Sequence, residues 1–150
     1  VIAITFGIVI ASLLFMRDIS NMTKVSDISN SKKQCPDGLP QNWAAYKING
    51  PLFFAAADRV FSELEYLCQA KQGVILYMDG VPILDAGGLS SMGKYIEYCR
   101  KHNIRLLIAD LQFQPLKTVA RAQVKPIENN FAFTSTMNEA LIKAHIQDWS

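Results

Sequence analysis

Short apolar runs alternate with amphipathic segments through most of the chain, and this alternation predicts an α/β fold. Nearly continuous apolar runs at 73–79 and 104–109 are typical of strands that are buried on both faces. Apolar residues recur with helical spacing at 54–70 and at 87–102. Strands that alternate with helices along a chain predict a mostly parallel sheet.

Weaker signals complete the predicted domain. Further strands are predicted at 43–49 and 131–133, which makes a sheet of about four to five strands. A short helix is predicted at 115–123. The spacing of Thr136 and Glu139 is that of a capping box, which opens a last helix.

The first sixteen residues are the most apolar stretch of the chain. Residues 1–16 are interrupted only by Thr5, Gly7 and Ser12, which membrane helices tolerate. At 1.5 Å per residue the stretch reaches about 24 Å, less than the roughly 30 Å of a hydrocarbon core, as expected for the end of a membrane helix. A buried helix and a signal peptide are the alternatives, but neither a basic leader nor a cleavage site is evident.

Polar residues dominate the next stretch, 17–42, which is rich in Ser, Asn and Lys and has no sustained period. We interpret it as a linker before the α/β domain at 43–150. Basic residues outnumber acidic ones over residues 17–33, as they do on the cytoplasmic side of membrane spans. The pattern predicts a cytoplasmic domain that follows a membrane helix.

Charge and cysteine content narrow the function classes. The formal net charge is only +2 and the basic residues are scattered, which argues against a nucleic-acid partner. Cys35, Cys68 and Cys99 form no C-x-x-C motif or His/Cys cluster, so neither a metal site nor a cofactor is expected. Cys68 and Cys99 fall on apolar helix faces and are predicted to be buried, reduced thiols, whereas Cys35 could be reactive.

Catalytic motifs are incomplete in this chain. The segment 88–92, GLSSM, approaches the G-x-S-x-G motif of α/β hydrolases, but it lacks the closing glycine and places Ser90 inside a predicted helix. His102 and His145 have no obvious nucleophile or carboxylate partner. We therefore predict that the chain is not an enzyme.

A capped turn, LDAGGL at 84–89, follows the central apolar run. Asp85 can cap the next helix by accepting the backbone N–H groups of Gly87 and Gly88. Glycines in a first helical turn are poor helix formers, but they let another backbone or a partner protein come close. The turn is either a cap with tight internal packing or a docking surface. An anion site is disfavoured because the Asp85 carboxylate already occupies these N–H groups.

Residues 43–149 resemble the STAS domain, which bacterial anti-sigma-factor antagonists share with the cytoplasmic tails of SulP anion transporters. The DAGG turn at 85–88 resembles the turn of the family, and two further segments are similar to the transporter branch: GPLFFAAA at 50–57, and FQPL at 113–116 with ARA at 120–122. The antagonists carry D-S-x-G at the turn, and that serine is phosphorylated. Ala86 stands at this position, so no phosphorylation is expected there.

The resemblance implies the C-terminal STAS domain of a multi-pass bacterial inner-membrane transporter for sulfate, bicarbonate or a dicarboxylate, with its last membrane helix ending in 1–16. It implies regulation through protein contacts, either with the transporter's own transmembrane domain, with a second protomer in a homodimer, or with a cytosolic protein. The alternative is a membrane-tethered signalling module that binds a kinase or sigma-factor regulator. The missing serine disfavours this alternative.

Two sets of candidate binding residues follow. The docking residues expected at the turn and in the loop before it are Pro82, Ile83, Asp85, Ala86, Gly87, Gly88 and Leu89. Lys117 and Arg121 are four residues apart on one predicted helix with no acidic partner at matching spacing. This pair is either a solvated face or a contact for an anion, a nucleotide phosphate or a lipid head group. The adjacent Phe53 and Phe54 are either core residues or a contact patch.

Overall fold

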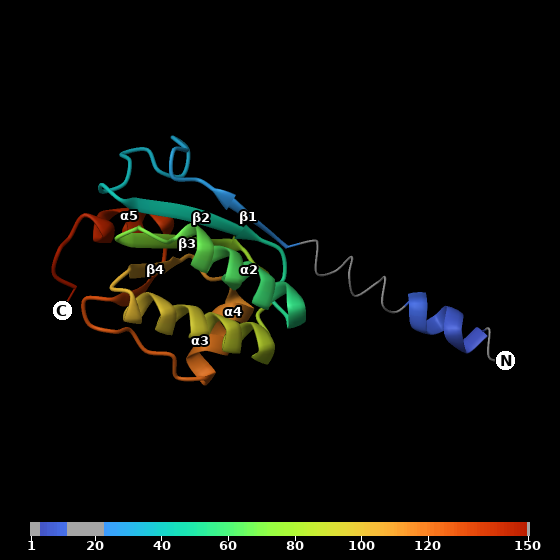
Figure 1. Ribbon diagram of the computed structural model, residues 1–150. Helices are drawn as coiled ribbons and strands as arrows, with labels where there is room; N and C mark the ends of the chain where they lie inside the picture. Colours follow the sequence, from blue (N-terminus) through green and yellow to red (C-terminus); the bar gives the residue numbers. More distant parts are fainter. Residues whose placement is uncertain (1–3, 12–22, 150) are drawn as a thin grey trace.

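A five-stranded sheet forms the centre of the domain in the computed structural model, which describes residues 4–11 and 23–149. The strands lie side by side in chain order (Figure 1): β1 (Lys24–Asp27), β2 (Trp43–Asn49), β3 (Gly73–Gly80), β4 (Arg105–Ala109) and β5 (Phe131–Thr134). The helices are α2 (Phe54–Leu67), α3 (Ala86–Lys101), α4 (Phe113–Arg121) and α5 (Met137–Ala144). The predicted α/β fold is confirmed.

Each parallel strand pairs with the strand that precedes it in the chain. Strand β1 is antiparallel to β2, whereas β2, β3, β4 and β5 are parallel neighbours. Helices α2, α3 and α4 cover one face of the sheet, and α5 covers the other (Figure 1). The carboxyl ends of β2 to β5 therefore lie along one edge of the sheet, which we call the carboxyl edge.

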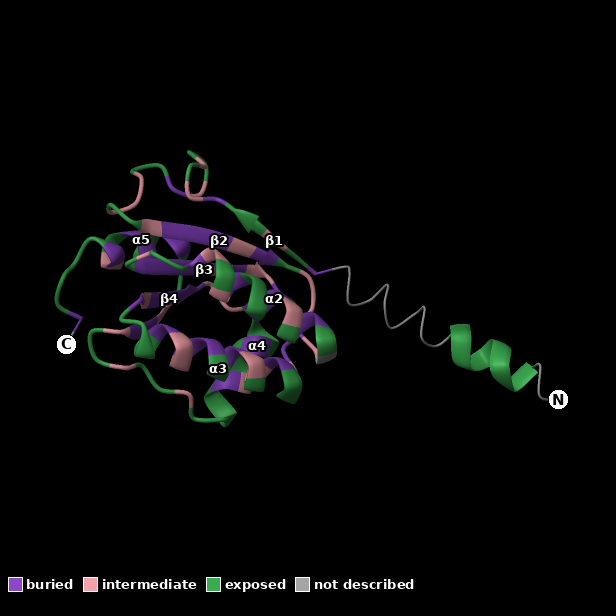
Figure 2. Cartoon of the chain, viewed as in Figure 1, coloured by how far each residue is buried: buried purple, intermediate pink, exposed green. Residues whose placement is uncertain are grey.

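Side chains of the central strand alternate between two hydrophobic cores. Val74 and Leu76 lie in the core beneath α2, α3 and α4, whereas Ile75 lies in the core beneath α5. Figure 2 shows strands β2, β3 and β4 largely buried between these layers. This burial on both faces is the reason why β3 and β4 read as almost continuous apolar runs.

The residues after α5 close the second core. Trp149 Nε1 donates to the carbonyl oxygens of Lys143 and Ile146 at 3.0 and 2.8 Å. The Arg105 guanidinium lies 4.5 Å from the Trp149 ring centre, and the Trp43 ring meets the Trp149 ring edge-on at 6.1 Å. The C-terminal segment is thereby fixed to the amino end of β4.

The segment before β2 packs on the domain, although its polar composition predicted a linker. Strand β1 pairs with β2, and Ile28 and Cys35 are buried in the second core. The Cys35 thiol donates to the carbonyl oxygen of Ile28 at 3.4 Å, and burial together with the neighbouring Asp27 raises the pKa of the thiol. A raised pKa and burial make Cys35 an unreactive thiol, not the reactive one considered above. Residues 17–22 of the predicted linker lie outside the described residues.

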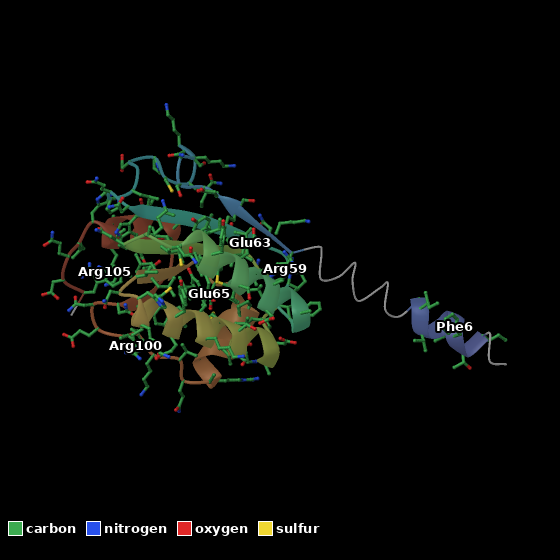
Figure 3. All side chains as sticks on the ribbon, in the orientation of Figure 1. Phe6, Arg59, Glu63, Glu65, Arg100 and Arg105 are labelled. Carbon is green, nitrogen blue, oxygen red and sulfur yellow. The ribbon has the colours of Figure 1, made fainter. Side chains whose placement is uncertain are left out.

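The apolar N-terminal segment is described only in part. Residues 4–11 are helical, and their side chains, Phe6 among them, are exposed (Figures 2 and 3). The rest of the predicted membrane segment, residues 1–3 and 12–16, lies outside the described residues. Among the helices that the structure describes, none has the length and apolarity needed to span a bilayer.

Candidate functional site

Asp85 caps α3 at the carboxyl edge, as the sequence predicted. Its carboxylate oxygen Oδ1 accepts a hydrogen bond from the Gly88 backbone N–H at 2.7 Å, and its backbone is extended, as is usual for an N-cap. The carboxylate therefore occupies the helix start. A second negative group would be repelled there, which leaves this turn suited to packing or protein contact.

Gly88 is buried because the turn sits tightly against the start of α2. A side-chain Cβ at Gly88 would overlap the Leu52 carbonyl oxygen and come within 2.8 Å of Leu84 Cδ1. Leu52 and Leu84 form a β-bridge, in which the Leu52 N–H donates to the Ile83 carbonyl at 2.8 Å. Gly88 thus serves internal packing, although the sequence placed it among the docking residues.

The remaining turn residues divide by exposure. Leu89 is half-buried and packs against the core of the helical layer, and Asp85 is half-buried. The exposed members are Pro82, Ile83, Ala86 and Gly87, and 46% of Ile83 is exposed. These four residues form the surface that a partner could contact. Of the two adjacent phenylalanines, Phe53 is half-buried.

Helix α4 braces this loop through contacts that the sequence did not reveal. Gln114 Oε1 accepts from the Leu84 N–H at 2.7 Å, and Gln114 Nε2 donates to the Leu84 carbonyl at 3.1 Å. Thr118 Oγ1 donates to the same carbonyl at 3.1 Å. One residue before α4, Gln112 Nε2 donates to the Asp79 carbonyl. The start of α4 and the turn before α3 therefore form one unit.

Exposed apolar and basic side chains share the outer face of α4. Phe113 is 79% exposed and Leu116 is 52% exposed, while Pro115 and Val119 face inward. Lys117 and Arg121 are exposed, as predicted, and Lys117 Nζ lies 5.7 Å from the Phe113 ring centre. The apolar members of this face, Phe113 and Leu116, were not predicted as contact residues. Their spacing beside Lys117 and Arg121 was the available signal.

The chain enters the domain at the same carboxyl edge. Thr23 is fully buried, and its Oγ1 donates to the Pro51 carbonyl at 2.6 Å. The guanidinium of Arg59, a residue of α2 that is labelled in Figure 3, donates to the Thr23 carbonyl. Pro51 precedes Leu52, which bridges to Leu84 of the turn. The entry point and the capped turn are therefore connected through one short segment.

The residues nearest to a catalytic motif lie within α3 and at its C-terminal end. Ser90 lies inside α3 and not on a strained turn after a strand. His102 Nδ1 lies 2.8 Å from the Tyr98 carbonyl oxygen, and its ring stacks on Tyr98 with the ring centres 4.1 Å apart. Both contacts hold the end of α3, so His102 serves as a helix cap.

The thiols of Cys68 and Cys99 are both buried between α2 and α3, as the apolar helix faces predicted. The hydrogen bond between the two thiols and burial raise the pKa of Cys99. Cys99 is therefore buried and protonated, which makes it a structural side chain. The same hydrogen bond lowers the pKa of Cys68, whose thiol is shielded by burial.

Comparison with known proteins agrees with this architecture. Residues 34–140 match the STAS domain family model. The “Putative sulfate transporter YvdB” of Bacillus subtilis (strain 168) is 28% identical over 120 residues, and the match covers 77% of this chain and 22% of that protein. The crystal structure of a sulfate transporter family protein from Wolinella succinogenes superposes with a TM-score of 0.61 at 25% identity. The match covers 79% of this chain and 95% of that one.

The family match spans strands β2 to β5, the capped turn and α4, and the chain covers about a fifth of the Bacillus subtilis relative's length. The two relatives are both described as sulfate transporter proteins. This chain belongs to the STAS domain family.

Proposed function

We propose that this chain is the cytoplasmic regulatory domain of a SulP-type anion transporter in a bacterial inner membrane. In this proposal the domain docks on the transporter's own transmembrane part through the exposed turn residues Pro82, Ile83, Ala86 and Gly87. The substrate class is sulfate or a similar small anion, in line with the names of the two relatives. The domain acts by contact and not by catalysis.

The observation that carries this proposal is the entry of the chain at Thr23, on the same edge as the capped turn. If residues 1–16 end a membrane helix, six residues separate that helix from Thr23. The seven residue steps from 16 to 23 span at most about 25 Å when fully extended. The carboxyl edge is therefore held close to the membrane part, and the opposite edge of the sheet lies farther away.

Anion uptake by the intact transporter tests this proposal. Ile83→Asp places a charge on the docking surface, and we expect initial uptake to fall several-fold at equal membrane abundance. The matched control is Tyr66→Asp, since Tyr66 is 73% exposed in the last turn of α2, away from the carboxyl edge. Equal uptake by both variants and the wild type would contradict docking at the turn.

A membrane-tethered signalling module is the second candidate, because STAS domains also occur in anti-sigma-factor antagonists. Ala86, directly after the cap, offers no hydroxyl for phosphorylation, which favours the transporter. Several membrane spans before this domain in the intact protein support the transporter, and a single span supports the module. For both candidates, hydrolase turnover that is lost in Ser90→Ala would show catalysis and contradict the proposal.

A further inference from the structure

The outer face of α4 is composed like a segment that lies at a membrane surface. Phe113, Leu116 and Ala120 are spaced at i, i+3 and i+7, and all three are exposed. Lys117 and Arg121 are spaced four residues apart and project from the neighbouring positions. A large exposed aromatic ring next to an exposed leucine costs free energy in water, unless another surface covers both side chains.

The charge on this face has one sign. From Gln112 to Ile127 the chain contains Lys117, Arg121 and Lys125 and no acidic residue. The Lys117 ammonium group lies 5.7 Å from the Phe113 ring, so a basic group and an aromatic ring project together. Basic side chains with long apolar stems, next to aromatic and leucine side chains, complement anionic lipid head groups above an acyl-chain boundary.

The position of α4 brings this face to the membrane side of the domain. Gln114 and Gln112 join the start of α4 to the β3–α3 loop, and Ile83 in that loop is also exposed. The chain enters the domain at the same edge, at Thr23. A short connection to a membrane segment therefore gives this edge a high effective concentration at the lipid surface.

We propose that the outer face of α4, made of Phe113, Leu116, Lys117 and Arg121, lies on the anionic lipid head groups of the membrane. The inference rests on the proposed function, because the membrane segment supplies the proximity. All four side chains are exposed, so they form no enclosed site that would orient a nucleotide base. A lipid surface needs only matching charge and exposed apolar groups.

An environment-sensitive fluorophore on Leu116→Cys tests this contact in the 150-residue chain. The native thiols are buried, so the label attaches at position 116. The labelled chain is reconstituted in vesicles of phosphatidylcholine alone or with about one-third phosphatidylglycerol. We expect brighter, blue-shifted emission only with the anionic lipid, and loss of this change at about 1 M salt, where the Debye length is about 3 Å.

Charge reversal provides the matched comparison. Lys117→Glu with Arg121→Glu should return the emission to that seen in neutral vesicles. Lys94→Glu with Lys101→Glu makes the same change in charge on exposed positions of α3 and should leave the emission unchanged. Circular dichroism and urea midpoints confirm that the labelled variants are folded.

Equal emission in neutral and anionic vesicles, or equal effects of the two double variants, would overturn the lipid contact. If uptake still falls in Ile83→Asp, docking on the transporter stands without it. If uptake is unchanged in Ile83→Asp while the anionic emission change remains, docking fails and the lipid contact stands.

Discussion

Gly88 has no side chain, and this lets the capped turn pack closely against the segment before α2. At Gly88 the obstacle to a side chain is the Leu52 backbone carbonyl, which is fixed by the bridge between Leu52 and Leu84. Backbone atoms cannot turn aside as the end of a flexible side chain can. The two glycines of the turn thus differ in role, since Gly87 is exposed and Gly88 is enclosed.

Gly88→Ala should lower the free energy of unfolding by about 2 kcal/mol or more, because the added methyl group overlaps that carbonyl. Gly93→Ala is the control in the same helix, where a Cβ meets open space. It should raise the free energy of unfolding by about 1 kcal/mol through helix propensity. Urea unfolding measures both, and a loss of stability in Gly93→Ala equal to that of Gly88→Ala would contradict the packing argument.

Helix α4 shows what a sequence pattern reveals about an element and what it does not. Its existence and its basic pair were predicted from local spacing. The hydrogen bonds from Gln114 to Leu84 join residues 30 positions apart, and no local pattern indicates them. Strand β1 was not predicted. It has four residues, lies at the edge of the sheet and is largely exposed, so it contains too few apolar positions to show a period.

The two predicted helix caps also show which contacts a local sequence pattern predicts and which it does not. Asp85 and Thr136 both accept the backbone N–H three residues ahead, as the sequence predicted. The Glu139 carboxylate, however, accepts from the Ser135 N–H and not from the Thr136 N–H of a standard capping box. The sequence located the capped turn, but packing between distant segments decides which of the predicted docking residues are exposed.

Gln114→Ala should loosen the β3–α3 loop more than the rest of the domain. The Leu84 N–H loses its partner at 2.7 Å, while Thr118 still donates to the Leu84 carbonyl. We expect a loss of about 1–2 kcal/mol in stability and faster amide exchange over residues 81–85. Hydrogen exchange of a Gln69→Ala control, changed at an exposed position, should match the wild type. An unchanged exchange rate of the Leu84 amide in Gln114→Ala would show that Gln114 does not stabilise the β3–α3 loop.

At the scale of the whole molecule, the entry point of the chain is part of the packed structure. Thr23 and Arg59 tie the first described residue of the domain to the β2–α2 loop and to α2. The position of Thr23 is therefore fixed relative to the rest of the domain. The capped turn and the start of α4 lie on the same edge of the sheet as Thr23.

Thr23→Val keeps the side-chain shape but removes the hydroxyl that donates to Pro51. We expect a loss of about 1 kcal/mol in the free energy of unfolding, and faster amide exchange across β1. Ser26→Ala, at an exposed position of β1, serves as the control. Urea unfolding and hydrogen exchange measure both effects. Equal stability and equal exchange rates in the two variants would contradict a stabilising role for the hydrogen bond from Thr23 to Pro51.

The three buried cysteines predict how the folded molecule reacts with thiol reagents. Burial raises the pKa of Cys35, and the hydrogen bond with Cys68 together with burial raises the pKa of Cys99, which lowers both thiolate fractions at neutral pH. The hydrogen bond with Cys99 lowers the pKa of Cys68 to about 7, so burial alone protects this thiol. We expect thiol labelling with a chromogenic disulfide at pH 7 to be orders of magnitude slower in the native chain than in urea. Immediate labelling of one thiol per chain under native conditions would show that a cysteine is accessible.

The order of the strands also has a consequence for biosynthesis. Every strand from β2 to β5 pairs with the strand synthesised immediately before it, so its first pairing partner is already present when it leaves the ribosome. A nascent chain can therefore add one strand-and-helix unit at a time. The hydrophobic core beneath α5 is completed last, because it includes Trp149, whose ring packs against Arg105.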